Sequence, residues 1–247
     1  MSEPTAIHHF HTQKERFNEV KKVLLFRSAL FIVLAVPGGI AIGSFGSNGA
    51  EMDMSVFFLT LPIALGAAGF GVFAALKRQK KIFETFRLSL NSEEVIREAQ
   101  EVPTFRMARS SIREIIKKKD GSFSIKGKSR MEIIEVPAQM QDYEDLERLL
   151  AEIRPITAND KLPFYQTIIG QILLSLFTLG LMATTYISDN KTIVLVSGTL
   201  IIGLMAYSFF EVQTNKNVDH RTKNVSWIFL FVMVSIIGMM YFKLMGG

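Results

Sequence analysis

Residues 77–160 have the sequence KRQKKIFETFRLSLNSEEVIREAQEVPTFRMARSSIREIIKKKDGSFSIKGKSRMEIIEVPAQMQDYEDLERLLAEIRPITAND. It is the one long segment with the composition of a water-soluble fold, and hydrophobic segments flank it on both sides. Its apolar residues alternate as in strands until about Asp142, where the spacing changes to a helical period. We therefore expect a small α+β domain, an antiparallel sheet closed by one helix, inserted in a membrane protein.

The composition of the whole chain is that of a membrane protein. Of its 247 residues, 49% are hydrophobic, and they occur in clusters. The formal net charge is +5, but membrane proteins concentrate Lys and Arg in cytoplasmic segments, so this charge does not predict binding to nucleic acid. The chain has no cysteine, which excludes disulfides, thiolate metal sites and cysteine nucleophiles.

Apolar runs with the length of a transmembrane helix, about 20 residues, occur five times. They are residues 26–45, 55–76, 164–187, 192–210 and 225–244. The first run begins too late for a cleavable signal, so we expect it to be retained. The chain then divides into an N-terminal segment with an interfacial helix (1–25), a transmembrane hairpin (26–76), a cytosolic domain (77–160) and three transmembrane helices (161–247).

Charge in the connections predicts the orientation of these five spans. The connection 46–54 carries two acidic residues and neither Lys nor Arg, whereas 77–81 and 211–224 are rich in Lys and Arg. Because positive loops stay in the cytoplasm, we expect a cytoplasmic N-terminus and an external C-terminus.

The N-terminal segment has weaker signals. Residues 1–11 show no period, and Thr12 with Glu15 has the spacing of a capping box that would start a helix near Gln13. A terminus without regular structure cannot orient ligands, so we predict no metal site at the histidines of this segment. These are His8, His9 and His11.

The spans contain no ionisable residue away from their edges, only Gln166, Gln171 and scattered hydroxyls. A retained charge inside the membrane usually serves a transport pathway, so this composition disfavours a proton-coupled pump or a carrier of charged substrates. An oligomer could still line a pore with hydroxyls and carbonyls.

The first two spans are rich in proline and small residues. Pro37 and Pro62 are potential interruptions, which also occur at transporter binding sites. Small residues recur every four positions, a spacing that allows close helix packing in lipid. The candidate packing residues are Gly39, Gly43, Ala67, Gly71 and Ala75. They would pack either within the chain's own bundle or against another membrane protein.

Within the soluble domain the sequence predicts six strands, at residues 82–90, 94–100, 104–109, 112–118, 122–126 and 130–136. Asp120-Gly121 is a two-residue hairpin signal. Asp142 is placed to cap a helix that ends before Pro155. Its apolar stripe comprises Tyr143, Leu146, Leu149, Leu150 and Ile153.

This order of elements resembles the bacterial PH-like domains of the YcxB-like type, over roughly a third of the chain. The resemblance rests on Ser111, Ile112, Glu114, Ile115, Asp120, Gly121, Ile134, Val136, Pro137, Tyr143 and Leu146. It implies a domain attached to transmembrane helices, and it implies seven strands where the sequence offers six. Eukaryotic relatives bind phosphoinositides through basic residues near the first hairpin, but Glu93 and Glu94 stand there, so we do not extend that activity to this chain.

Two basic clusters are candidate contact sites. A polybasic segment beside a membrane attracts anionic lipid and helps to orient the spans. We assign both roles to Lys77, Arg78, Lys80 and Lys81. The second cluster is either a solvated strand end or a partner contact, and it consists of Lys117, Lys118 and Lys119.

No catalytic motif is present, and the only acid–base pair to consider is Asp219 beside His220, which we interpret as loop residues. We predict no enzyme and no cofactor. The hypothesis is a noncatalytic membrane scaffold or regulatory subunit, whose domain binds a protein partner or the anionic membrane surface; its partners are lipids and another membrane protein or a second copy. The alternatives are a small oligomeric transporter or channel gated by the domain, and an enzyme acting on lipids.

Overall fold

The computed structural model of the chain describes residues 7–45, 54–129, 131–158, 167–215 and 217–246. It contains two compact units. The sheet unit consists of the described parts of Met1–Lys22, Ala75–Leu162 and Asn215–His220. The helix unit consists of the described parts of Val23–Ala74, Pro163–Thr214 and Arg221–Gly247.

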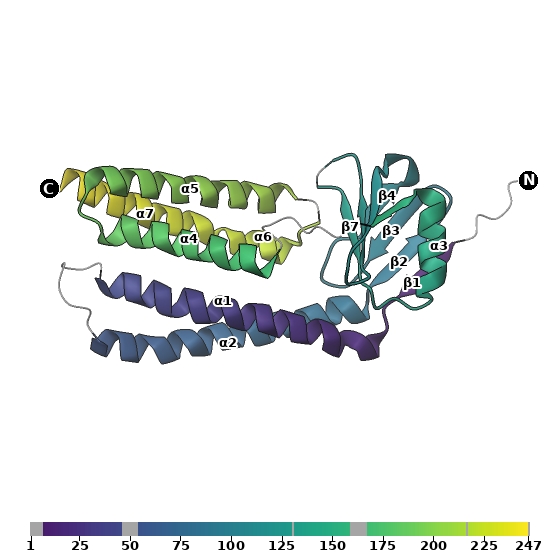
Figure 1. Cartoon of the computed structure of the whole chain (residues 1–247), viewed down its shortest axis with the longest axis horizontal. Coiled ribbons are helices and arrows are strands. Elements are labelled where there is room, and N and C mark those ends of the chain that lie inside the picture. The colour runs from purple at the N-terminus through teal and green to yellow at the C-terminus, as the bar shows by residue number, and fades with distance from the viewer. Residues whose placement is uncertain (1–6, 46–53, 130, 159–166, 216, 247) are drawn as a thin grey trace, which may run out of the picture. The chain divides into compact units, whose positions relative to one another are not determined.

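One four-stranded sheet of the sheet unit is antiparallel throughout, in the order β1-β2-β3-β4 (Figure 1). Its strands are β1 (His8–His11), β2 (Arg87–Leu90), β3 (Glu94–Glu98) and β4 (Phe105–Ala108). The edge strand β1 comes from the N-terminus and pairs His8 with Leu90 and His11 with Arg87. The prediction that residues 1–11 lack structure is therefore wrong for His8–His11, because β2 offers them a sheet edge that no local pattern reveals.

The other sheet has the order β7-β6-β5-β8. Its strands are β5 (Glu114–Lys117), β6 (Phe123–Lys126), β7 (Ile133–Val136) and β8 (Ile156–Ala158), and the 3-10 helix η2 (Arg109–Ser111) leads into it. The hairpin at Asp120-Gly121 is confirmed, with Gly121 at φ 82°, a conformation that favours glycine. Its connection is longer than the two residues expected, since Lys118 N donates to Ser122 O at 2.8 Å.

The core of the sheet unit is apolar and closed. Helix α3 (Tyr143–Ile153) packs its stripe on the sheets, with Leu146 and Leu150 fully buried beside Phe123 (Figure 1). The predicted helix is confirmed, but its cap is not: Asp142 has φ 48° and its side chain makes no capping bond. Pro155 ends the helix, and β8 then pairs in parallel with β5, a short strand that the sequence did not predict.

The predicted strand 82–90 begins too early. Helix α2 (Met54–Glu84) continues to Glu84, and Thr85 Oγ1 closes its end by donating to Lys81 O at 2.7 Å. Phe83 is buried and its ring lies 5.6 Å from that of Phe17. Apolar contacts thus extend the helix where alternation alone suggested a strand.

The predicted capping box is also wrong. The hydroxyl of Thr12 donates to Phe83 O. The 3-10 helix η1 (Lys14–Arg16) has Gln13 at its N-cap position and no side-chain capping bond. Helix α1 (Phe17–Phe45) follows directly and runs through Pro37, as α2 runs through Pro62. These two spans are continuous helices.

Five helices of the described chain are long and apolar enough to cross a membrane. Besides α1 and α2 they are α4 (Ile168–Ile187), α5 (Lys191–Thr214) and the continuous pair α6 (His220–Ser226) and α7 (Ile228–Met245). Helices α4, α5 and α7 lie side by side (Figure 1), with a core of Val194, Ile201, Ile236 and Met240. The predicted connection 46–54, save its last residue, and the predicted span start 164–166 lie outside the described residues.

Candidate functional site

The connection between α5 and α6 belongs to the sheet unit, in which hydrogen bonds hold it next to β7. Asn217 Nδ2 donates to two backbone carbonyls, those of Met131 at 2.9 Å and Ile133 at 3.0 Å. These carbonyls lie just before and at the start of β7. Through one amide group, a short segment between two spans is held at the start of a strand more than 80 residues away in the sequence.

An ion pair adds a second attachment next to Asn217. Arg78 Nη2 lies 2.5 Å from Asp219 Oδ1, and the two side chains are only 23% and 13% exposed. Arg78 also donates to Glu101 O at 3.4 Å, and Lys81 Nζ lies 2.7 Å from Glu101 Oε1. Glu101 has φ 69°, an uncommon conformation for a residue with a side chain. The end of α2, the β3–β4 turn and the α5–α6 connection therefore meet in one charged cluster.

This cluster contains most of the residues predicted to contact lipid. Lys80 is 3.6 Å from Glu84, so Arg78, Lys80 and Lys81 each have an acidic neighbour. Among the described residues, Lys77 makes no ion pair and is exposed. Paired cations attract anionic lipid less strongly than free ones, because each partner offsets their charge.

The predicted partner-contact lysines also differ from one another. Lys117 Nζ lies 2.7 Å from Glu147 Oε1, and Lys118 Nζ lies 2.7 Å from Glu135 Oε2. Lys119 is exposed in the turn before Gly121. Two of the three lysines therefore join elements of the domain, and Lys119 is the one presented to solvent.

Lys117 lies over two aromatic rings. Its Nζ is 5.4 Å from the centre of the Tyr143 ring and 5.8 Å from that of Phe123. The hydrogen bond that Lys117 donates to the Glu147 carboxylate raises the pKa of Lys117. Burial raises the pKa of Tyr143, whose hydroxyl donates to Gly121 O at 2.7 Å. Both residues are thereby held in their protonated forms.

Four of the five small residues predicted to pack in lipid are uncovered. A Cβ built on Gly39 or Gly71 would meet no atom within 4 Å, and Ala67 and Ala75 are exposed. No residue in the most apolar window of either helix is buried. Gly43 lies in the last turn of α1, outside the positions whose surroundings the structure describes.

Gly198 of α5 is different, because it is packed within the helix unit. A Cβ on Gly198 would clash with the Met240 side chain of α7, whereas one on Gly38 would make an ordinary contact with Leu179 of α4. The chain itself therefore requires a missing side chain at Gly198, and not at Gly39 or Gly71.

A charge near the end of α7 has an internal role. Lys243 Nζ donates to the carbonyls of Tyr186 at 2.7 Å and Ser188 at 2.8 Å, which end α4. A cation is favourable at a helix C-terminus, where carbonyls lack partners and the macrodipole is negative. This lysine is therefore part of the helix packing.

The residues considered for chemistry do not assemble. Asp219 pairs with Arg78, and no group of three His, Cys, Asp or Glu side chains within the described ranges could hold a metal ion. His9 Nδ1 lies 2.9 Å from Ser89 Oγ. The pKa of His9 is lowered, mainly by desolvation and to a smaller extent by the positive charge of Arg87.

Comparisons with family models, with curated proteins and with solved structures found no match to this chain.

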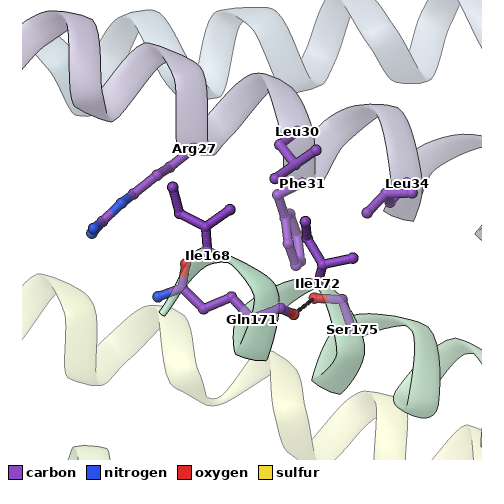
Figure 2. Close-up of a pocket in the computed structure, with 8 residues that line it drawn as sticks. All are labelled: Arg27, Leu30, Phe31, Leu34, Ile168, Gln171, Ile172 and Ser175. Atoms are coloured by element: carbon purple, nitrogen blue, oxygen red, sulfur yellow. Dashed lines mark hydrogen bonds between the residues drawn. The ribbon is translucent and has the colours of Figure 1, made fainter. Parts of the chain in front are cut away.

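Sequence reasoning missed the parts that depend on distant segments. Asn217 gave no signal other than its place in a polar loop between two apolar runs, and Glu101 gave none. Arg27, inside the first apolar run 26–45, gave no signal of its own, yet it lines a groove between α1 and α4 (Figure 2).

Proposed function

We propose that the protein is a noncatalytic scaffold or regulatory subunit of a bacterial inner membrane, whose α1–α2 hairpin docks against another membrane protein. The observation that carries this proposal is that Gly39 of α1 and the regularly spaced Ala67, Gly71 and Ala75 of α2 are uncovered. In lipid, helices associate through close packing at such residues, since hydrophobicity gives no preference for protein over lipid.

The sheet unit is the second docking element of this proposal. Its charged residues favour a protein partner over a lipid surface, because Arg78, Lys81, Lys117 and Lys118 already have acidic partners. Lys119 and Lys77 remain as exposed cations for a contact.

We further propose that the sheet unit is a PH-like domain of the YcxB-like type. Four antiparallel strands, three further antiparallel strands and a helix follow one another in that order, if β1 is counted as the first strand. The transmembrane hairpin would then be an insertion between the first and second strands. β8 is an addition to the seven strands that the resemblance implies.

The proposed orientation places the N-terminus in the cytoplasm and the C-terminus outside. The basic segments 77–81 and 211–224 support it, as positive charge is retained inside. Lys243 would lie on the external side, where the charge rule does not favour a lysine. Its hydrogen bonds to the carbonyls of Tyr186 and Ser188 account for this exception.

A transporter or channel has less support. Helices α1 and α2 are not interrupted at their prolines. The buried hydroxyls of Thr185 and Ser197 lie 2.8 Å apart, and each also lies 2.8 Å from a backbone carbonyl of its own helix, so both have partners within the helix unit.

A photo-crosslinking residue at position 71, used in native membranes, tests the docking proposal. The matched control is position 238, where Gly238 is also uncovered but its neighbours one turn away are the large residues Val234 and Phe242. We expect one foreign protein to be captured from position 71 and not from position 238. The same products at both positions, or lipid alone, would refute the proposal.

A further inference from the structure

A groove runs between α1 and α4 in the helix unit (Figure 2). Its walls are apolar, with Leu30, Phe31 and Leu34 from α1 facing Ile168 and Ile172 from α4. One turn beyond Leu34, Gly38 lies next to Leu179 of α4, where the two helices come close together.

One end of the groove is polar. Arg27 and the side-chain amide of Gln171 lie there together (Figure 2). Arg27 is exposed, and among the residues that the structure describes it makes no hydrogen bond or ion pair. A guanidinium at the edge of an apolar span is stabilised by an anion, and the most abundant anions at that depth are lipid phosphates.

The start of α4 adds to the same positive potential. The helix begins at Ile168, has 20 residues and carries no acidic residue in its first turn. Thr167 caps the helix by accepting from Gly170 N at 3.0 Å, and the macrodipole adds a partial positive charge beside Arg27 and the amide of Gln171.

The size of the groove limits what fits. Its volume is about 40 Å³. A water-sized group needs about 10–15 Å³ by this measure, so the groove holds a row of about three such groups. A compact solute of the usual ligand size does not fit, whereas a few methylenes of an alkyl chain do.

We infer that this groove binds one anionic phospholipid, with its phosphate at Arg27 and Gln171 and part of one acyl chain between Leu30, Leu34 and Ile172. The two ends of the groove match the two ends of such a lipid in charge and polarity. This site is independent of the docking surface at Gly39 and Gly71.

The test uses the full chain in mild detergent, titrated with phosphatidylglycerol or with phosphatidylcholine of identical acyl chains, and bound lipid is counted by native mass spectrometry. We expect one tightly bound phosphatidylglycerol. Because a charge-assisted hydrogen bond is lost, Arg27→Gln should weaken it about tenfold, and the preference over phosphatidylcholine should vanish. Arg27→Lys should keep most of that preference.

Two further variants separate the groove from general charge. Lys22→Gln removes the same charge five residues earlier on the same helix and should leave binding unchanged. Ile172→Trp fills the groove without changing charge and should weaken both lipids. Equal effects of Arg27→Gln and Lys22→Gln, equal binding of the two lipids to the wild type, or a protein subunit that excludes lipid from the groove would overturn the inference.

Discussion

Arg78 and Asp219 form an ion pair of 2.5 Å between the end of α2 and the connection that follows α5. In the sequence, Asp219 stands beside His220 as one half of a possible acid–base pair. In the structure it is an attachment point, and its carboxylate is three-quarters or more removed from solvent. The ion pair holds the segment between α5 and α6 against the end of α2 within the sheet unit.

Replacing Asp219 tests this attachment. Asp219→Asn leaves Arg78 largely buried without its counter-charge, so the opening free energy of the sheet unit should fall by about 1–3 kcal/mol. Hydrogen exchange at the β7 amides of the full chain measures it. A cycle with Arg78→Met should show coupling between the two sites, whereas Glu152→Gln, which removes an exposed 3.9 Å partner of Arg148, should cost less than about 0.5 kcal/mol.

Asn217 should be equally sensitive. Asn217→Ala removes both bonds to the Met131 and Ile133 carbonyls, and we expect about 1–2 kcal/mol less protection at β7. Asn217→Asp should be worse at neutral pH, because a carboxylate would face two carbonyl oxygens. Asn18→Ala, at an exposed position in the first turn of α1, is the control. Equal exchange in all variants would contradict the attachment.

Alkaline pH should destabilise the sheet unit. The folded-state pKa values of Lys117 and Tyr143 are both raised, so their contribution is complete below about pH 10, the usual range of the unfolded groups. It is lost as the pH rises through the folded-state pKa values. The thermal midpoint of the full chain between pH 8 and 11 measures this loss.

Lys117→Met should flatten that pH dependence, and Lys119→Met should not. At pH 8, Lys117→Met should cost less than about 1 kcal/mol, since Lys117 and Glu147 are each about one third exposed and solvent screens the pair. An identical alkaline loss in the Lys117→Met variant would show that this pair does not control it.

Substitution by alanine should destabilise the chain at a packed glycine and should have little effect at an uncovered one. Gly198→Ala places a Cβ against Met240, so we expect about 1–3 kcal/mol of destabilisation of the helix unit, less if the Met240 side chain moves. Gly71→Ala meets no atom and should change stability by less than about 1 kcal/mol. Unfolding in mixed detergent measures both. Equal losses would show that Gly71 is also packed within the chain.

Local patterns predicted much of this fold. The apolar runs located five helices able to span a membrane, and the stripe through Leu146 and Leu150 located α3, because burial imposes a period on neighbouring residues. Asp120-Gly121 located a hairpin because the turn needs a residue with positive φ.

The unpredicted parts depend on residues far away in the sequence. β1 forms because β2, about 80 residues later, offers an edge, and β8 forms because β5 does. The end of α2 stays helical through contacts of Phe83 with Phe17 and Thr12. The candidate site at Arg78 and Asp219 needed three segments to meet, and no spacing within one segment encodes that meeting.

The central claim is that the α1–α2 hairpin docks through the small residues Gly39, Ala67, Gly71 and Ala75. Native mass spectrometry of the full chain, gently extracted from its own membrane, tests it most directly. We predict a stoichiometric foreign subunit with the wild type and with Gly238→Leu, and its loss from the double variant Gly39→Leu, Gly71→Leu. A wild-type protein that carries only lipid, a small solute or further copies of itself would contradict the claim.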